Sequence, residues 1–253
     1  MIYYHNYMKQ NVYDNKIFFS EYQKMRSEDI NANNLIEKPN FRDLIPDLTG
    51  KRVLDLGCGN GELAVYCLEH GASQVVGIDI SQNMINVAKQ NKDPRLTFLK
   101  MAMEDLPNLQ GRFDVILSSL AFHYIKDFDK LIEDIRRHLT DNGVLIFSQE
   151  HPMATCFVPA KKQTNSKPEI DGKRYYLISD YNNLGKRTSH WYIDGVIKYH
   201  RNFQTLINTL IENGFKLDKI LEPSADAYAI KLEPKYKYQT DRPYFLFIKA
   251  SVI

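Results

Sequence analysis

The chain has 253 residues, of which 43% are hydrophobic and 25% charged, enough for one α/β domain with a sizeable core and a small addition. A net charge of +2 without a clustered basic face argues against a nucleic-acid groove. The N-terminus has no apolar signal core, no stretch is apolar enough to span a membrane, and the three cysteines lack metal-ligand spacing. We therefore expect a cytoplasmic protein without a metal, acting on neither nucleic acid nor membrane.

The first 150 residues divide into a lead-in and a repeating core. Residues 1–50 are polar with a helical apolar stripe, and Pro46 and Gly50 end them. Within residues 51–150, apolar strands alternate with helical segments, and we place strands at 52–56, 74–79, 96–100, 113–118 and 144–148. The pair Asn142-Gly143 predicts a turn into the last of these. This alternation predicts a doubly wound α/β fold, with a mostly parallel sheet and helices on both faces.

The alternation stops after Glu150. Residues 151–202 are irregular and rich in Lys, Asn, Gly and Tyr, and we interpret them as an inserted substrate lid in a single domain, 1–253. Within the lid, Asp194-Gly195 suits a type I′ turn and predicts a β-hairpin. Residues 203–253 then supply a C-terminal helix, ended by Gly214, and the last strands.

A glycine loop follows the first predicted strand, in the run Val53-Leu-Asp55-Leu-Gly57-Cys-Gly59-Asn-Gly61. Such a loop lets a ligand approach the backbone near a helix N-terminus. The dinucleotide fingerprint would require glycine at position 62, where the sequence has Glu62. Carboxylates at Asp55 and Glu62 would repel a pyrophosphate but attract a cation. The pattern favours S-adenosylmethionine, which carries an ammonium and a sulfonium and no phosphate, over NAD.

Asp79 ends the second predicted strand, one strand away from the glycine loop. A carboxylate in this place can accept hydrogen bonds from both hydroxyls of a ribose. The alternative is a charge favouring the N-terminus of the helix that Ser81 begins. We favour ribose binding because the glycine loop is so close.

Five segments in the right order resemble the class I methyltransferase family, in its large type 11 branch of small-molecule and quinone-type enzymes. They are Val53–Gly61, Val76–Met84, Glu104–Pro107, Phe113–Ser118 and Leu139–Phe147. The resemblance implies a seven-stranded sheet with an antiparallel last strand and S-adenosylmethionine over the strand ends. A narrower likeness to an uncharacterised bacterial subgroup rests on the segments Tyr22-x-x-Met-Arg26, Glu150-His151-Pro152, Trp191, Lys198–Arg201 and Asp241–Leu246.

Carried over residue by residue, the resemblance implies a cofactor site. Gly57 and Gly59, with Cys58 between them, would line the methionine half, and Asp55 would reach the ammonium through water. Asp79 would hold the ribose. The remaining expected contacts are Ile80 and Met84 by the adenine, Ser118 below the methionine moiety, and the segment Ala102-Met103-Glu104.

The sequence departs from the family at Ala102. The family often has an acidic residue there, which contacts the adenine amino group, and the side chain of Ala102 cannot make that contact. The backbone of Met103 can serve instead, and the methionines are equally suited to the core. From the lead-in, Tyr22 and Arg26 are expected to cover the cofactor, with Arg26 pairing with its carboxylate, unless they belong to an ordinary exposed helix.

Two histidines are the candidates for a catalytic base. His123 follows the fourth strand and His151 the fifth, so both should lie beside the cofactor crevice. Each also has a structural interpretation, His123 as a partner of a loop carbonyl and His151 as part of a rigid turn at Pro152. Glu150 either orients His151 or lies in solvent.

The expected function is methyl transfer to O, N or C of a small molecule, with S-adenosylhomocysteine as the product. One alternative is a regulatory module that senses S-adenosylmethionine without turnover. Another is an RNA or protein methyltransferase, although the sequence has neither a basic extension nor an Asn/Asp-Pro-Pro-Tyr motif to clamp a planar amine. The sequence does not identify the acceptor or choose between a monomer and a homodimer.

Overall fold

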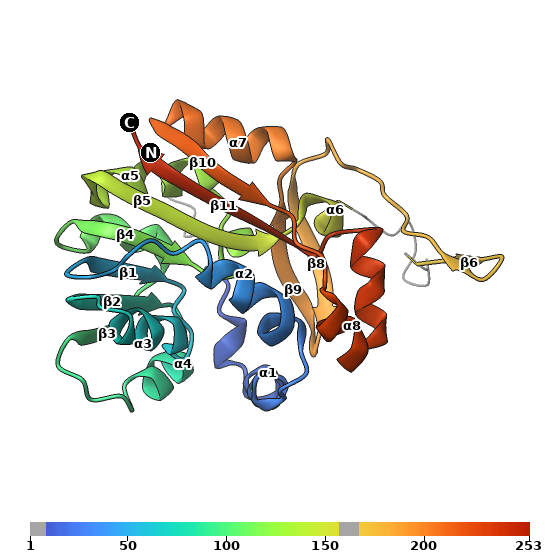
Figure 1. The fold of residues 1–253 in the computed structure, drawn as a ribbon, viewed down its shortest axis with the longest axis horizontal. Coiled ribbons are helices and arrows are strands. Elements are labelled where there is room, and N and C mark those ends of the chain that lie inside the picture. Colours follow the sequence, from blue (N-terminus) through green and yellow to red (C-terminus); the bar gives the residue numbers. More distant parts are fainter. Residues whose placement is uncertain (1–8, 157–166) are drawn as a thin grey trace, which may run out of the picture.

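The computed structural model describes residues 9–156 and 167–253, and its centre is a seven-stranded sheet (Figure 1). The strand order is β3-β2-β1-β4-β5-β11-β10. The first five strands run parallel, and β11 is antiparallel to both of its neighbours. This confirms the predicted doubly wound sheet with an antiparallel last strand. The strands are β1 (Arg52–Leu56), β2 (Gln74–Asp79), β3 (Leu96–Lys100), β4 (Phe113–Ser118), β5 (Leu139–Glu150), β10 (Phe215–Leu221) and β11 (Phe245–Val252).

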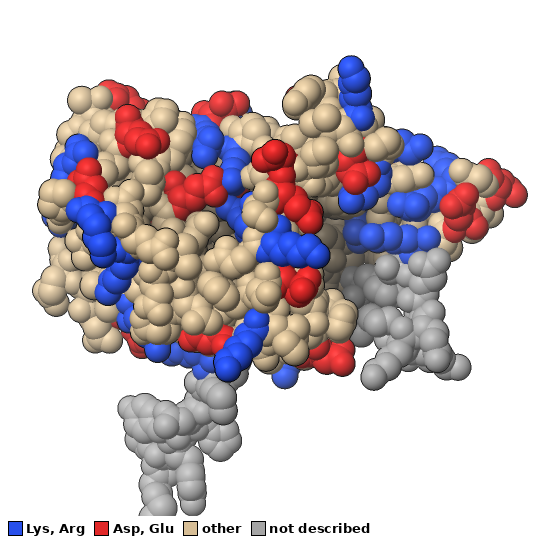
Figure 2. All heavy atoms as spheres, turned by 90° about the horizontal axis from the view of Figure 1, so that it is seen from below, with Lys and Arg blue, Asp and Glu red and all other residues tan. Residues whose placement is uncertain are grey.

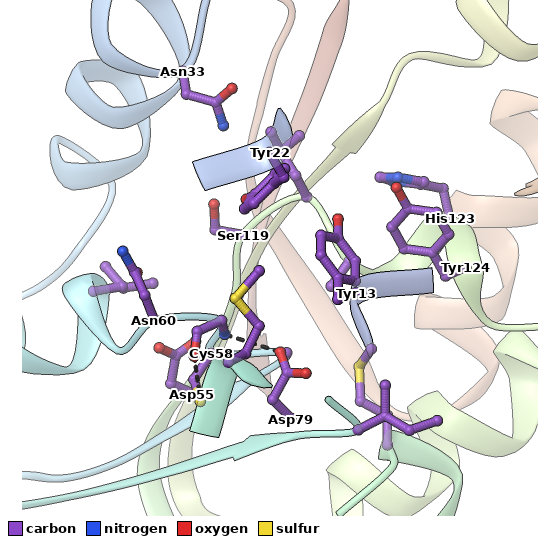
Figure 3. A pocket seen from close by; sticks show the side chains of 18 of the residues that line it. Tyr13, Tyr22, Asn33, Asp55, Cys58, Asn60, Asp79, Ser119, His123 and Tyr124 are labelled. Atoms are coloured by element: carbon purple, nitrogen blue, oxygen red, sulfur yellow. Dashed lines mark hydrogen bonds between the residues drawn. The ribbon is translucent and has the colours of Figure 1, made fainter. Parts of the chain in front are cut away.

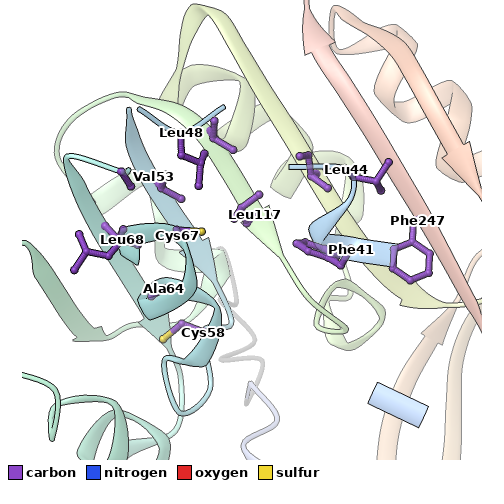
Figure 4. Close-up of a cluster of buried hydrophobic side chains, with 14 of the residues drawn as sticks. Phe41, Leu44, Leu48, Val53, Cys58, Ala64, Cys67, Leu68, Leu117 and Phe247 are labelled. Carbon is purple, nitrogen blue, oxygen red and sulfur yellow. The ribbon is translucent and has the colours of Figure 1, made fainter. Parts of the chain in front are cut away.

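Helices cover both faces of the sheet, and each face has its own apolar core. One core, seen in Figure 4, joins Phe41 and Phe247 with Leu117 and Ala64. It lies under α2 (Lys38–Arg42), α3 (Glu62–Glu69), α4 (Gln82–Ala88) and α8 (Ala227–Leu232). The other core lies under α5 (Phe128–His138) and α7 (Phe203–Glu212). Burial on both faces fits the nearly continuous apolar runs in the central strands.

The lead-in is helical, as predicted, and its first turn contacts the segment that joins β2 to α4. It contains η1 (Val12–Asp14), α1 (Lys16–Ser27) and the π-helical turn η2 (Asn33–Glu37). Asp14 accepts hydrogen bonds from the Ser81 hydroxyl at 2.6 Å and from the backbone N–H of Asn83 at 3.0 Å. A carboxylate at this place favours the helix N-terminus, so Asp14 fastens η1 to the start of α4.

The predicted hairpin is present, but its turn is not at Asp194-Gly195. Strands β8 (Gly185–Trp191) and β9 (Ile193–His200) pair up to Trp191 and Ile193, leaving Tyr192 at the tip with φ of 60°. Asp194 and Gly195 lie inside β9. The rings of Trp191 and Tyr192 both pack against Phe18, with centroids 5.1 and 5.7 Å away. This aromatic packing outweighs the local turn preference.

The predicted turn at Asn142-Gly143 falls inside the range of β5, where the pairing with β4 is irregular. Residues 140–143 lie opposite Asp114 alone, and a Cβ atom on Gly143 would lie 2.8 Å from the Cβ of Leu139, so the chain folds back there. Regular pairing resumes at Val144, where the predicted strand begins.

Short elements complete the chain. Within the expected lid lie α6 (Pro152–Thr155) and the two-residue strands β6 (Glu169–Ile170) and β7 (Lys173–Arg174), while residues 157–166 lie outside the described part. Between the larger elements lie the 3-10 turns η3 (Met103–Asn108), η4 (Phe122–Tyr124) and η5 (Pro234–Thr240).

The surface carries both signs of charge. In Figure 2 lysines and arginines alternate with acidic residues over most of the visible face and gather toward the end that holds β6 and β7. Over residues 9–156 and 167–253, no helix is long and apolar enough to cross a membrane. The same residues contain no group of three or more His, Cys, Asp or Glu side chains placed to hold a metal ion.

Candidate active site

A cavity of about 290 Å³ opens at the carboxyl ends of the parallel strands. The segments that follow β1, β2, β3 and β4 form its floor and sides, as expected for a doubly wound sheet. The lead-in and the hairpin residue Trp191 cover it. In Figure 3 the carboxylates Asp55 and Asp79 lie at one end, and Tyr13, His123 and Tyr124 lie together at the other.

Most of the residues predicted from the sequence line this cavity. They are Tyr22, Arg26, Asp55, Gly57, Cys58, Gly59, Asp79, Ile80, Met84, Ala102, Met103, Glu104 and His123. Two predicted residues, Ser118 and His151, do not line it.

Glycine is required in the loop after β1. Gly57 has φ of +73°, and a Cβ atom there would lie 2.7 Å from the Cβ of Ala121. Gly59 also has positive φ, at +53°, and an added Cβ would meet no atom within 4 Å. The backbone around Gly59 is therefore open to a ligand on the cavity side.

The carboxylate of Asp79 organises the loop beside it. One of its oxygens accepts from the backbone N–H of Gly59 at 2.9 Å and the other from Ser81 at 2.8 Å. Each carboxylate oxygen has a second acceptor site. Asp79 can therefore bind a ribose diol while still holding the loop, and burial raises its pKa.

Asp55 is buried with an unsatisfied oxygen. Only 2% of the residue is exposed, and Oδ2 has no hydrogen-bond partner. Burial, followed by the nearby charges of Asp79 and Glu37, raises the pKa of Asp55 to about 8. Such a carboxyl group fits a cationic ligand, which would restore its charge and supply the missing donor.

Glu62 differs from the expectation. It forms ion pairs with Arg26 at 3.0 Å, with Lys38, and with Arg42 at 3.6 Å. Burial opposes ionisation of Glu62, but these cations, Lys38 first, lower its pKa. Glu62 therefore presents no free negative charge, and Asp55 rather than Glu62 carries the electrostatic case against a pyrophosphate. Arg26 lines the cavity beside this cluster, where an anionic group of a ligand would find cations.

The imidazole of His123 is poorly suited to act as a base. The ring is 4% exposed, and burial above all lowers its pKa to about 4. Its Nδ1 accepts from the backbone N–H of Glu150 at 3.4 Å. The neutral ring must then carry its proton on Nε2, so this nitrogen is a hydrogen-bond donor.

His151 is part of the scaffold, which corrects the expectation that it reaches the crevice. Its Nδ1 accepts from Met153 N at 3.1 Å and caps α6, while Nε2 lies 2.6 Å from Glu222 Oε1. Glu222, not Glu150, orients it. Ser118 is likewise fully buried, and its hydroxyl donates to the carbonyl of Leu56 at 2.8 Å. The next residue, Ser119, lines the cavity instead.

Several lining residues escaped the sequence prediction. Tyr13 and Tyr124 hydrogen-bond through their hydroxyl groups, and Glu150 forms an ion pair with Lys198 of β9. Glu37, at the end of η2, is a buried carboxyl group on the cavity wall. No motif marks Tyr13, Tyr124 or Glu37, because the cavity brings them together from segments far apart in the chain.

Known proteins share this architecture and much of the sequence. A methyltransferase domain family matches residues 54–147. A methyltransferase from Mesorhizobium loti, described as S-adenosylmethionine-dependent, is 33% identical, covers 88% of this chain and 99% of its own, and superposes with a TM-score of 0.78. A Listeria monocytogenes structure with the same assignment, made provisionally, is 35% identical over 86% of this chain and 98% of its own, with a TM-score of 0.74. An uncharacterised Haemophilus influenzae protein is 39% identical over 97% of this chain and 98% of its own.

The chain belongs to the S-adenosylmethionine-dependent methyltransferases, on a class I fold. S-adenosylmethionine is the cofactor, and the residues of the cavity fit it. The orphaned oxygen of Asp55 suits its ammonium, the open backbone at Gly59 suits its close approach, and Asp79 suits its ribose. The contacts of individual residues with the cofactor stay predictions.

Proposed function

We propose that this methyltransferase acts on a small, uncharged acceptor with a planar group, bound at the aromatic end of the cavity. The observation that carries the proposal is the wall of rings there, formed by Tyr13, Tyr22, Tyr124 and Trp191. Ring centroids of Tyr13 lie 5.0 Å from Tyr22 and 6.4 Å from Tyr124, in edge-on arrangements. Such a wall contacts a planar molecule through its faces and offers hydroxyl groups at its rim.

The charges at this end support an uncharged acceptor. Glu150 is neutralised by Lys198, and burial keeps the His123 ring neutral. Burial also raises the pKa of Tyr13 and of Tyr124, so their hydroxyl groups stay protonated. The two hydroxyl groups bond to each other, so one hydroxyl proton and the Nε2–H of His123 are left as donors, which suit an acceptor bearing oxygen or nitrogen lone pairs.

Positioning then accounts for catalysis. When bound, the cofactor supplies a methyl group on a sulfonium, which needs little further activation. The rings of Tyr13, Tyr22 and Trp191 hold the acceptor in line with that methyl group and exclude water, and alignment of this kind supplies about 7–11 kcal/mol of the barrier. No base is needed if the acceptor has a free lone pair at neutral pH. His123 Nε2–H and Tyr124 orient the acceptor by hydrogen bonds.

Methyl transfer from isotope-labelled S-adenosylmethionine tests the proposal. The purified protein is incubated separately with a low-molecular-weight metabolite fraction, an RNA fraction and a protein fraction from bacteria, and with a panel of planar nitrogen heterocycles; planar phenols, which must lose a proton, serve as the comparison. We expect label in the small-molecule fraction and in members of the panel, and none with Asp79→Ala. Label confined to RNA or protein contradicts the proposal, and binding without any transfer favours the sensor. The expected cytoplasmic location and the oligomeric state stay predictions.

A further inference from the structure

Glu37 is a buried carboxyl group whose contacts within the fold an amide could also make. The residue is 2% exposed, and its Oε1 accepts from the hydroxyl groups of Ser148 at 2.6 Å and Ser119 at 2.8 Å. Both serines lie at the ends of neighbouring strands, so they hold the carboxyl group against the floor of the cavity. Because both bond to the same oxygen, Oε2 is left for a ligand.

The position of Glu37 relates it to the cofactor end. The charges that act on it are those of Arg26 and Lys38, and Glu37 acts in turn on Asp55. Burial raises the pKa of Glu37, as it does that of Asp55. Two buried carboxyl groups thus face one cavity, and one of them, Asp55, has an oxygen without any partner. Such a pair is costly to ionise unless a cation lies between them.

We propose that Glu37, together with Asp55, binds the α-ammonium group of S-adenosylmethionine. Arg26 and Lys38, which form ion pairs with Glu62, also act on Glu37, and both line the cavity. Acidic and basic groups therefore occur together at this end of the cavity, which matches the ammonium and carboxylate of an amino acid. Glu37 comes from the lead-in, so binding of the cofactor's amino-acid end would also stabilise the contact between the lead-in and the sheet. The inference concerns the cofactor and does not depend on the acceptor.

Calorimetric titration with two ligands isolates this contact. S-adenosylhomocysteine carries the amino-acid group, whereas 5′-methylthioadenosine has the same nucleoside and a thioether without it. In Glu37→Gln the amide oxygen can still accept from Ser119 and Ser148, but the charge is gone. We expect its affinity for S-adenosylhomocysteine to fall on the order of 10- to 100-fold, as for a hydrogen bond to a charged group. Its affinity for methylthioadenosine should change by less than about twofold.

Two further variants separate charge from folding. Asp134→Asn removes a buried carboxylate that is paired with Lys130 on α5, away from the cavity, and should leave both affinities unchanged. Glu37→Asp keeps the charge but shortens the side chain, which moves the carboxylate away from the ligand. This variant should lower the affinity for S-adenosylhomocysteine and leave that for methylthioadenosine unchanged, even if Glu37→Gln does not fold. Equal losses for both ligands, or unchanged S-adenosylhomocysteine binding in either Glu37 variant, overturn the inference. Reduced methyl transfer with unchanged S-adenosylhomocysteine affinity would also overturn it, and would assign Glu37 to the acceptor.

Discussion

The two ends of the cavity treat charge in opposite ways. At the cofactor end, Asp55 is buried with an unsatisfied oxygen and a pKa raised to about 8. At the acceptor end, Glu150 is matched by Lys198, and His123 is neutral. The cofactor end therefore has a carboxyl group without a counter-ion, whereas the charged group at the acceptor end is already paired. If the proposed function holds, the difference separates the part of the site that recognises a charged donor from the part that accommodates an uncharged acceptor.

The largest effect is expected for Asp79→Ala. This change removes the predicted hydrogen bonds to the ribose, each worth about 1.5–3 kcal/mol for a charged partner, and it also releases the N–H groups of Gly59 and Ser81. Calorimetry should show at least a 100-fold loss of S-adenosylhomocysteine affinity, on the order of the two bonds combined. Asp93→Asn, on the surface, serves as the control. Retained affinity in Asp79→Ala would remove the ribose assignment.

The ion pair at the acceptor end should reveal itself in a double-mutant cycle. Lys198→Met leaves the Glu150 carboxylate without its cation in a partly buried place, and we expect a loss of about 1–3 kcal/mol in the free energy of unfolding. Adding Glu150→Gln should recover part of this loss. Chemical denaturation of the four proteins measures the coupling. Additive losses would mean that the two charges do not compensate each other.

The cofactor end should respond to pH. With the pKa of Asp55 raised to about 8 in the free protein, a cationic ligand must displace a proton below that pH. The affinity for S-adenosylhomocysteine should therefore fall as the pH is lowered from 7.5 to 6, by up to about tenfold per pH unit. Titrations in buffers of different ionisation enthalpy should detect the released proton. Asp55→Asn should bind more weakly and lose this dependence, and a wild type without it would contradict the raised pKa.

The acceptor end should be indifferent to pH in the same range. Because burial lowers the pKa of His123 to about 4, its ring stays neutral above pH 5.5. The kcat of methyl transfer, once an acceptor is found, should show no step from His123 between pH 5.5 and 7.5. His123→Gln keeps a donor and should lower kcat by no more than roughly tenfold, as for one neutral hydrogen bond. A step near pH 6.5 that this variant abolishes would restore His123 as the base.

The smallest effect on the reaction is expected for His151→Asn. Asparagine is also a good helix N-cap, so the start of α6 should be kept, but the hydrogen bond to Glu222 is lost and the free energy of unfolding should fall by about 1–3 kcal/mol. Steady-state kinetics should give an unchanged kcat. A fall of two orders of magnitude would mean that His151 takes part in the reaction after all.

The sequence predicted most of the residues that line the cofactor end of the cavity, because they are close to one another along the chain. Gly57, Gly59 and Asp79 follow directly from strands that their apolar runs reveal, and a parallel sheet brings the strand ends together. The same logic failed for His151, since the backbone at Pro152 turns the ring toward Glu222 and the start of α6. A position after a strand does not determine where its side chain points.

The acceptor end could not be predicted in this way. Tyr13, Tyr124 and Trp191 come from the lead-in, the β4–α5 connection and the hairpin, and only tertiary packing brings them together. Glu62 shows a related difficulty, because its neutralising cations lie on α1 and α2, at least 20 positions earlier in the chain. The sequence gives the sign of a side-chain charge, but it does not show which opposite charges lie beside that side chain in the fold.

The short segment before α1 is held over the cavity by hydrogen bonds from Gln10 and Asp14, and product release depends on how strong these bonds are. Gln10 forms two hydrogen bonds with the backbone of Ile197 in β9, and Asp14 binds the start of α4. One short segment of chain therefore connects the hairpin with the helix that follows β2. These fastenings are polar and peripheral, at about 0.5–1.5 kcal/mol each. Release of S-adenosylhomocysteine past this segment would break only a few such bonds and would leave the sheet beneath it unchanged.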